Sequence, residues 1–415
     1  MTRRRNRGGA RRDSPKRGEA RHPSVEVAIE SLAAGGDGVG HLPDGRVVFV
    51  PFTAPGDRVQ IEVLEERASF ARGRVLELVV ASATRAQPVC PVFGSCGGCA
   101  WQHIDYRTQQ DAKAQILAEA LSRIGSIRVE APIPVTPSPA EYRYRSRTRV
   151  LEGDGRVGYR KRRSNALCAV SRCPVLLEPV EARLAELSKA AGKARPEGRH
   201  GAVTFEWEIA LGAPDEGAAR SVRLPEARGK AIHLRVGEDR LRVSPGVFSQ
   251  SNGLLLEDLA AAVHGAAGRG VFVLELFAGA GFFTLGLARR FARVLAVESN
   301  RRAVDDLEAN LVSAGLANVD ARCEMVEETV AHLTEMGSDA VVVLDPPRSG
   351  LPDGCARDLV RHRDVTRLVY LSCDPATLAR DLGIFVDADF ELTDLRIFDL
   401  FPQTPHVESL AVLER

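Results

Sequence analysis

One stretch, in which an apolar segment, a glycine turn, a helical pattern and a second apolar segment follow one another, constrains the fold most. The first apolar segment, residues 271–276, runs into Gly279-Ala280-Gly281, and the helical pattern begins at about Phe282. The second apolar segment, residues 294–297, ends at Glu298. This order builds a βαβ unit of a parallel sheet, in which glycines let the backbone approach a ligand closely. The stretch predicts a Rossmann-like domain with a ligand site at the turn.

The same stretch indicates which ligand this would be. An acid at the tip of the second strand, here Glu298, can accept hydrogen bonds from both ribose hydroxyls of a nucleoside. The turn reads ELFAGAG and lacks the three-glycine GxGxxG pattern of pyrophosphate binders. S-adenosylmethionine is therefore a better fit than NAD. From about residue 254 onward, strand and helix patterns alternate, which predicts an α/β domain whose parallel sheet is covered by helices.

The length of 415 residues suggests about three domains. Residues 24–80 contain short alternating apolar runs separated by glycine turns, which predicts a small antiparallel β-barrel. Such a barrel is a common platform for nucleic acids, although its shape alone fixes no function. We place this barrel at residues 23–82, a central domain at 83–250 and the α/β domain at 251–415. Within the central domain, helical patterns occur near residues 105–124 and 178–192.

The first 22 residues form a basic tail. They hold nine Lys and Arg against Asp13 and Glu19, a net charge of +7, so the rest of a chain that totals +1 carries −6. We interpret the tail as disordered, either as a solubilising arm or as a contact to phosphates. It has no apolar stretch, and no segment is typical of a signal peptide or a membrane span. Eight cysteines without a secretory signal point to the cytoplasm.

Three further segments carry chemistry at places where open α/β sheets keep their active sites. Asp345 ends an apolar strand and precedes two prolines. Cys373 ends another and precedes a helix, whose N-terminus favours a thiolate, so it is a candidate nucleophile. A proline-flanked loop near the end supplies Phe401, His406 and Glu408, and so offers an acid or base. A rigid turn with a capping Asp345 is the plainer alternative for the first segment.

Taken together, five motifs resemble those of the RNA 5-methyluridine (uracil-5-) methyltransferase family. They are FSQSN at residues 248–252, ELFAGAG at 275–281, DPPR at 345–348, SCDP at 372–375 and FPQTPHVE at 401–408. The barrel is similar to a TRAM domain, and a cysteine cluster is similar to that of the iron–sulfur branch, which resembles the 23S rRNA (uracil-5-)-methyltransferases.

The resemblance implies methyl transfer from S-adenosylmethionine to C5 of a uridine through a covalent adduct. Cys373 would be the nucleophile that adds to uracil C6, and Glu408 would accept the C5 proton. Arg348 would offer a planar surface to the flipped uracil. The residues implied at the cofactor site are Gln250, Phe277, Glu298 and Asp345. Phe282 and Met325 depart from the family pattern, and we leave both out of the site.

The cysteine cluster consists of Cys90, Cys96 and Cys99, with the spacing C-x5-C-x2-C. A tetrahedral four-thiolate site suits either zinc or an iron–sulfur cluster, and the spacing alone does not separate them. The resemblance favours a [4Fe–4S] cluster with Cys173 as the fourth ligand and a structural role. Cys168 is the alternative fourth ligand.

A second basic segment follows the cluster. Arg143, Arg145, Arg147 and Arg149 recur at every second position, which predicts one basic face of a strand with Tyr142 and Tyr144 on the other. With residues 160–163 (RKRR) this face could track phosphates. A solvated face with salt bridges is the alternative.

The resulting hypothesis is a monomeric, cytoplasmic RNA uracil-5-methyltransferase that acts on 23S ribosomal RNA and binds no membrane. Transfer RNA is the nearest alternative substrate. A catalytically silent RNA-binding protein of ribosome assembly is the alternative of another class, although Cys373 and Glu408 are both present. A small-molecule methyltransferase fits poorly with the barrel and the basic segments.

Overall fold

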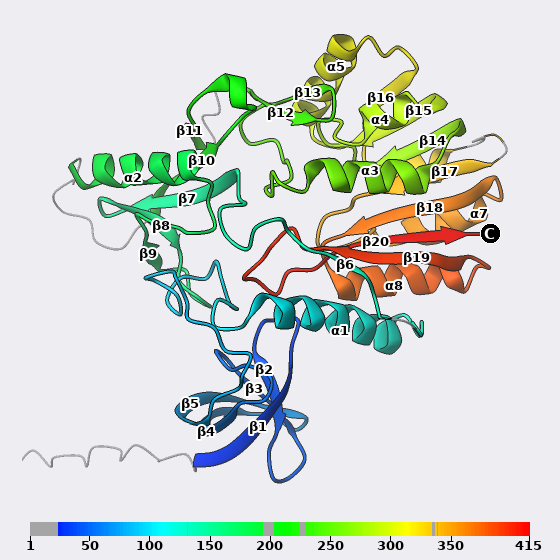
Figure 1. Ribbon diagram of the computed structural model, residues 1–415. Coiled ribbons are helices and arrows are strands. Elements are labelled where there is room, and N and C mark those ends of the chain that lie inside the picture. The colour runs from blue at the N-terminus through cyan, green and yellow to red at the C-terminus, as the bar shows by residue number, and fades with distance from the viewer. Residues whose placement is uncertain (1–23, 131, 194–202, 225–229, 334–336, 338) are drawn as a thin grey trace, which may run out of the picture.

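The computed structural model describes residues 24–130, 132–193, 203–224, 230–333, 337 and 339–415. The predicted basic tail at residues 1–22 lies outside this range. A small barrel, a central sheet and a large C-terminal sheet follow one another along the chain (Figure 1), so the predicted multi-domain α/β class is confirmed. None of the described helices is long and apolar enough to cross a lipid bilayer.

The barrel is closed by five strands in the order β1-β2-β3-β5-β4. These strands are β1 (Ser24–Leu32), β2 (Gly38–His41), β3 (Val47–Val50), β4 (Arg58–Glu66) and β5 (Phe70–Val80). Alternate residues such as Val27, Ile29, Val48 and Ile61 fill the interior, as the apolar alternation predicts. The predicted barrel is confirmed.

The central sheet has the order β11-β10-β7-β8-β9 and is covered by α2 (Glu178–Lys193). Its strands are β7 (Arg147–Gly153), β8 (Arg156–Arg160), β9 (Leu167–Ala169), β10 (Val203–Ala210) and β11 (Arg220–Leu224). A short 3-10 helix, η1 (Pro214–Glu216), lies between β10 and β11. A hairpin of β12 (Ile232–Val236) and β13 (Asp239–Val243) follows the sheet and precedes the C-terminal sheet in the chain.

The predicted four-arginine face is wrong. Strand β7 begins only at Arg147, and Arg143 lies before it with a left-handed φ of +55° and an ion pair of 2.6 Å to Glu181. Arg147 is buried and pairs with the buried Glu208 at 2.5 Å, and Arg149 lies 3.5 Å from the same carboxylate. Acidic residues distant in sequence therefore neutralise part of this segment, and no local pattern reveals them.

The C-terminal sheet has eight strands in the order β16-β15-β14-β17-β18-β20-β19-β6. The parallel strands predicted from the alternating pattern are β14 (Gly270–Leu276), β15 (Phe291–Glu298), β16 (Val319–Cys323), β17 (Ala340–Leu344) and β18 (Val365–Ser372). Strand β20 (Glu408–Glu414) runs antiparallel to both β18 and β19 (Glu391–Phe398). Strand β6 (Val135–Thr136) joins the edge from the middle of the chain.

Helices pack on both faces of this sheet. One face contacts α3 (Leu256–Ala267), α4 (Thr284–Ala288) and α5 (Arg301–Ala314), and the other contacts α6 (Val326–His332), α7 (Cys355–Arg361) and α8 (Pro375–Val386). Buried runs such as that of β17, in which every residue is buried, are typical of strands covered on both sides. The helix after the glycine turn is shorter than predicted, because α4 begins at Thr284 rather than at about Phe282.

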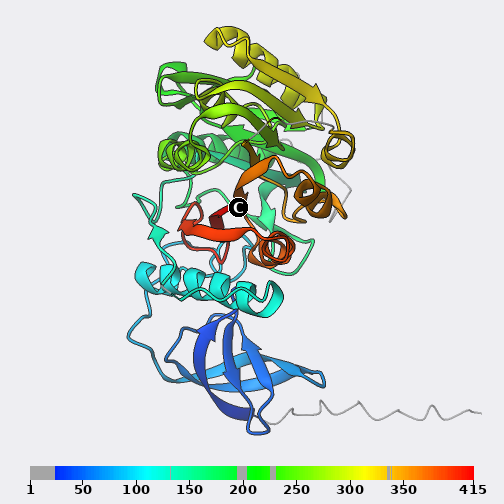
Figure 2. The ribbon, with the colours of Figure 1, turned by 90° about the vertical axis from the view of Figure 1, so that its right-hand side faces the viewer.

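Helix α1 (Tyr106–Ile124) lies between the barrel and the C-terminal sheet in both views (Figures 1 and 2). Its buried Leu117 and Leu121 belong to the same core as Leu378 of α8. The two helices approach closely at Gly125, where a Cβ atom would lie 2.5 Å from the carbonyl oxygen of Ala379. Helix α1 therefore belongs to the core of the C-terminal sheet, although its sequence precedes the central sheet.

Candidate active site

The glycine turn leaves β14 at the carboxyl edge of the sheet. Phe277, Gly279 and Gly281 all have left-handed φ angles, of +65°, +56° and +92°. Glycine suits such angles, whereas Phe277 is a rare non-glycine residue there. Apart from the chain neighbours of Gly279, no heavy atom lies within 4 Å of the position that its Cβ would take. The turn therefore leaves open space beside its backbone, as a cofactor cradle requires.

Glu298 holds this turn from the end of β15. Its carboxylate accepts hydrogen bonds from the Gly279 amide at 3.0 Å and from the Asn300 amide at 2.7 Å. The Asn300 side chain in turn caps α5 by accepting from the Arg302 amide at 3.1 Å. A carboxylate has about four lone-pair sites, so Glu298 can still accept hydrogen bonds from a ligand.

Three reactive side chains come from neighbouring strand ends. Asp345 follows β17, Cys373 follows β18, and Glu408 begins β20. Strands β18 and β20 pair in a register that places Ser372 opposite Ser409, so Cys373 directly follows one member of this pair and Glu408 directly precedes the other. Directly opposed residues on antiparallel strands lie about 5 Å apart. The fold therefore brings the predicted nucleophile and the predicted base together.

The electrostatics of this cluster favour neutral groups. Burial, followed by the charges of Glu408 and Asp345, raises the pKa of Cys373 to about 11, and the charge of Arg348 partly opposes this rise. Burial raises the pKa of Asp345 to about 7. Burial, followed by the charge of Asp345, raises the pKa of Glu408 well above its usual value. The raised pKa values therefore favour the protonated forms of these three side chains, and the Cys373 thiol must lose its proton before its sulfur can react as a thiolate.

The predicted stabilisation of a Cys373 thiolate by the end of α8 is wrong for the free protein. The carboxylate of Asp374 accepts hydrogen bonds from the Ala376 and Thr377 amides, both at 3.0 Å, so it uses the free amides of the helix end. Cys373 meets two carboxyl groups instead, which oppose a second negative charge.

Arg348 and His406 lie beside each other in the same region. The Arg348 Nη2 atom is 3.4 Å from His406 Nε2, and Arg348 is exposed. Burial, followed by the positive charge of Arg348, lowers the pKa of His406 to about 4. His406 is therefore neutral near pH 7, and the guanidinium of Arg348 is the cationic group that faces Cys373 and Glu408.

A cavity of about 500 Å³ opens between the central sheet and the loop that joins β19 to β20. Gln250 lines it and is buried, while the neighbouring Phe248 is 69% exposed. Asn252, at the end of the same FSQSN motif, is fully buried and donates hydrogen bonds to Ser138 Oγ at 3.0 Å and to the Leu400 carbonyl at 3.2 Å. Asn252 therefore connects the FSQSN motif to the loop that contains His406, and the sequence alone does not predict this role.

The four predicted metal ligands, Cys90, Cys96, Cys99 and Cys173, line this same cavity as free thiols. Cys168 is buried under the central sheet and does not line the cavity. Burial raises the pKa of Cys96 to about 11 and that of Cys99 to about 12. In the part of the chain that the structure describes, no three His, Cys, Asp or Glu side chains are grouped closely enough to hold a metal ion as they stand.

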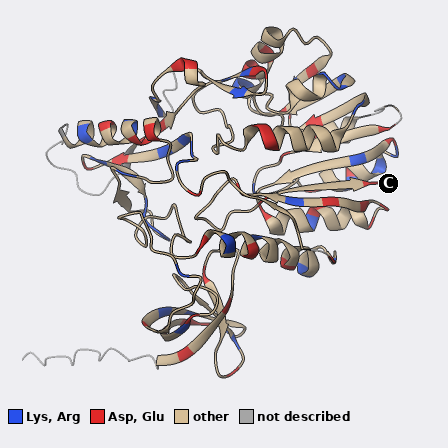
Figure 3. Cartoon of the chain, in the orientation of Figure 1, with Lys and Arg blue, Asp and Glu red and all other residues tan. Residues whose placement is uncertain are grey.

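Part of the predicted phosphate-tracking surface serves to join domains. Arg162 and Arg163 both form ion pairs with the buried Asp37 of the barrel, so residues 160–163 are not all free for phosphates. Arg149 remains 48% exposed and lines the cavity together with Arg145. Acidic and basic residues are interspersed over the helices of the C-terminal domain (Figure 3), and Arg145 and Arg149 are basic residues that line the cavity.

Comparison with known proteins decides the family. Residues 233–415 match the tRNA (uracil-5-)-methyltransferase family model, and residues 24–76 match the TRAM domain. A 23S rRNA (uracil(1939)-C(5))-methyltransferase RlmD of Alkalilimnicola ehrlichii is 35% identical, over 94% of this chain and 96% of that protein. The chain belongs to the RNA uracil-5-methyltransferase family. The prediction from its motifs is confirmed.

Other relatives of this methyltransferase agree. The RlmD enzyme of Halomonas elongata is 33% identical, over 94% of this chain and 89% of its own length. The crystal structure of Pyrococcus abyssi tRNA (uracil-54, C5)-methyltransferase in complex with S-adenosyl-L-homocysteine aligns with a TM-score of 0.69 at 23% identity. That alignment covers 94% of this chain and 100% of the other, so the two methyltransferases share their whole fold.

Proposed function

We propose that this methyltransferase transfers a methyl group from S-adenosylmethionine to C5 of a uridine in 23S ribosomal RNA, through a covalent adduct with Cys373. The observation that carries the proposal is the register of β18 and β20, which pairs Ser372 with Ser409 and so brings the adjacent Cys373 and Glu408 close enough to influence each other's charge. The relatives that are 33% and 35% identical over nearly the whole chain are named as 23S rRNA enzymes, which favours that RNA over transfer RNA.

The proposed cofactor site lies along the glycine turn. The open space beside Gly279 and the carboxylate of Glu298 fit a nucleoside, and Gln250, Phe277 and Asp345 are the other proposed contacts. S-adenosylmethionine supplies an electrophilic methyl group when it is bound. Its positive charge would also stabilise the ionised forms of nearby carboxyl groups such as Asp345.

The chemistry proposed for the chain itself has three steps. Cys373 gives up its proton to the neighbouring Asp345 carboxylate, and its sulfur adds to uracil C6, which makes C5 an enolate carbon. C5 then forms its bond to the methyl group, whose bond to the sulfonium sulfur would break so that S-adenosylhomocysteine leaves. Glu408, as carboxylate, removes the C5 proton, and the C6–S bond breaks so that the pyrimidine and the thiolate are restored. Arg348 is the proposed planar contact for the uracil.

The uracil must leave its base stack to reach these groups, so looped or single-stranded RNA is the proposed partner. The proposed active form is a cytoplasmic monomer, because one chain contributes every group proposed for the reaction.

The substrate assignment is tested by incubating the enzyme and labelled S-adenosylmethionine separately with unmodified 23S rRNA and transfer RNA transcripts. After digestion to nucleosides, we expect label in 5-methyluridine from the ribosomal RNA only. Label from transfer RNA only would contradict the substrate, and label in neither RNA, with cofactor bound, would favour a silent RNA-binding role.

We also propose that Cys90, Cys96, Cys99 and Cys173 hold a [4Fe–4S] cluster. Four free thiols line the same cavity, which supplies the number and kind of ligands that such a cluster takes, and a bound metal would deprotonate them despite the raised pKa values of Cys96 and Cys99. The cluster takes no part in methyl transfer and would fix the segment that precedes α1.

We expect protein purified without oxygen to contain iron and sulfide in equal amounts and to show broad visible absorbance. Cys99→Ser should lose most of the iron. Cys323→Ser should keep it, because Cys323 lies on β16, away from the cavity. Stoichiometric zinc without iron would overturn this assignment.

A further inference from the structure

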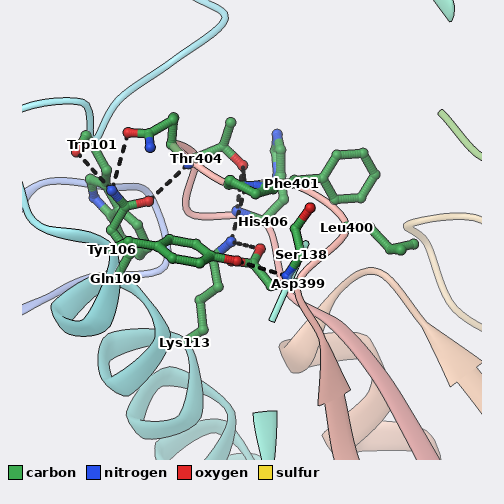
Figure 4. A network of polar contacts seen from close by, with 12 residues as sticks. Trp101, Tyr106, Gln109, Lys113, Ser138, Asp399, Leu400, Phe401, Thr404 and His406 are labelled. Carbon is green, nitrogen blue, oxygen red and sulfur yellow. Dashed lines mark hydrogen bonds and ion pairs between the residues drawn. The ribbon is translucent and has the colours of Figure 1, made fainter. Parts of the chain in front are cut away.

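The loop between β19 and β20 is held from below by helix α1 (Figure 4). The Lys113 ammonium donates hydrogen bonds to Asp399 Oδ1 at 2.5 Å and to the Phe401 carbonyl oxygen at 3.0 Å. Both side chains of the ion pair have 0% exposure. Neither Lys113 nor Asp399 is among the residues proposed to contact the uracil or the cofactor, and both are fully buried, so this pair is separate from those contacts.

A second anchor holds the middle of the loop. Gln403 is buried and has a left-handed φ of +70°. The backbone amide of Gln403 donates to Gln109 Oε1 at 2.8 Å, and Gln109 Nε2 donates to Gln403 Oε1 at 3.1 Å. Gln109 lies one helical turn before Lys113 on α1, so the two residues share one face of the helix. This face of α1 therefore contacts the loop between β19 and β20 at two points, through Gln109 and through Lys113.

The register of β19 connects these anchors to Glu408. Phe398, the last residue of β19, pairs directly with Glu408, the first residue of β20. Asp399 follows Phe398 immediately, so the ion pair with Lys113 fixes the chain where it leaves the strand that supports Glu408. A shift of Asp399 would therefore disturb the pairing between Phe398 and Glu408 and with it the position of the Glu408 side chain.

A gain in folding stability alone does not explain the buried ion pair between Lys113 and Asp399. Burial lowers the pKa of Lys113, and the charge of Asp399 only opposes that effect. Replacing a buried ion pair with apolar residues of similar volume is often neutral or stabilising, so a buried pair is weak support for stability and better support for defined geometry. A cation that bridges a carboxylate and a carbonyl of one loop specifies the conformation of that loop.

We propose that Lys113 is a positioning residue, which holds the loop through Asp399 and the Phe401 carbonyl so that Glu408 is placed to remove the C5 proton. The proposal rests on the proposed function, because it concerns the step assigned to Glu408. It predicts that losing the pair slows release of the covalent RNA adduct more than its formation.

The test compares wild-type enzyme, Lys113→Met, and the double variant Lys113→Met/Asp399→Leu, which leaves no unpaired buried charge. Because a misplacement of about 1 Å can cost 10²-fold in rate, we expect kcat of the double variant to fall about 10- to 100-fold at unchanged KM for the RNA. Denaturation-resistant RNA–protein adduct should accumulate during turnover. Arg123→Met, which removes an exposed cation of the same helix, should behave as wild type.

A merely structural role predicts a different result. In that case the double variant would be less thermostable, would lose activity only in proportion to its unfolded fraction, and would build up no adduct, and this outcome would overturn the proposal. So would a folded double variant with the kcat of wild type. The wild-type arm keeps the two claims apart, since absence of 5-methyluridine there would count against the proposed function instead.

Discussion

Cys373→Ala should abolish RNA methylation. Without the sulfur no covalent bond forms at uracil C6, so C5 is never activated, and we expect a loss of turnover of at least about 1,000-fold, in line with losses of other catalytic nucleophiles. No denaturation-resistant RNA adduct should form. The measurement is labelled 5-methyluridine released from digested RNA over time, with binding of S-adenosylhomocysteine as the check that the cofactor site is intact.

Cys323→Ala is the matched control, because Cys323 ends the edge strand β16, where its thiol donates to the Ser299 carbonyl oxygen, and is not among the strand ends that carry Cys373, Asp345 and Glu408. It should retain turnover. Wild-type rates in Cys373→Ala would remove the nucleophile assignment altogether.

Glu408→Gln should trap the reaction after methyl transfer. A general base contributes about 10²- to 10⁴-fold, and we expect kcat to fall by that factor while methylated, covalent RNA adduct accumulates. The variant should fold, because Glu408 is 3% exposed and its raised pKa makes the native side chain neutral, like glutamine, in the free protein. Gel electrophoresis under denaturing conditions measures the adduct.

Glu414→Gln provides the comparison on the same strand. Glu414 ends β20, far from Cys373, and pairs with Arg367 at 3.0 Å. This variant should turn over normally. Normal turnover in Glu408→Gln would show that another group removes the C5 proton.

Local sequence patterns predicted much of the fold. Alternating apolar residues between glycine turns predicted the barrel, and uninterrupted apolar runs such as residues 340–344 predicted buried parallel strands. The antiparallel edge could not be predicted in this way. Strand β6 has only two residues, and its partner β19 lies more than 250 residues later in the chain, so nothing local identifies the pairing.

Asp345 and Cys373 were visible because each follows an apolar strand, where a parallel sheet collects its active-site groups, whereas Glu408 was found in a proline-flanked loop that matches a family motif. The residues that position them were not. Lys113 and Gln109 occupy the apolar stripe of α1, at the spacing of Ile116 and Leu117, which is an unusual place for polar side chains and the one signal that could have found them. Their partners Asp399 and Gln403 are almost 300 residues away.

The errors have a common physical cause. The arginine face and the Cys373 thiolate were both predicted from local charge patterns. In the structure, Glu181 and Glu208 lie beside the arginines. The free amides at the N-terminus of α8 donate hydrogen bonds to Asp374 rather than to the Cys373 thiol. Electrostatic effects depend on neighbours in space, and those neighbours come from other elements.

The most direct test of the account is the covalent intermediate itself. Ribosomal RNA that carries 5-fluorouridine at the target position cannot lose a proton from C5, so an enzyme that works through Cys373 should stop at a stable adduct. After incubation with S-adenosylmethionine and digestion with protease and nuclease, mass spectrometry should find the peptide with Cys373 enlarged by one fluorinated nucleotide and one methyl group. An adduct on another cysteine, or methylation with no adduct at all, would contradict the account.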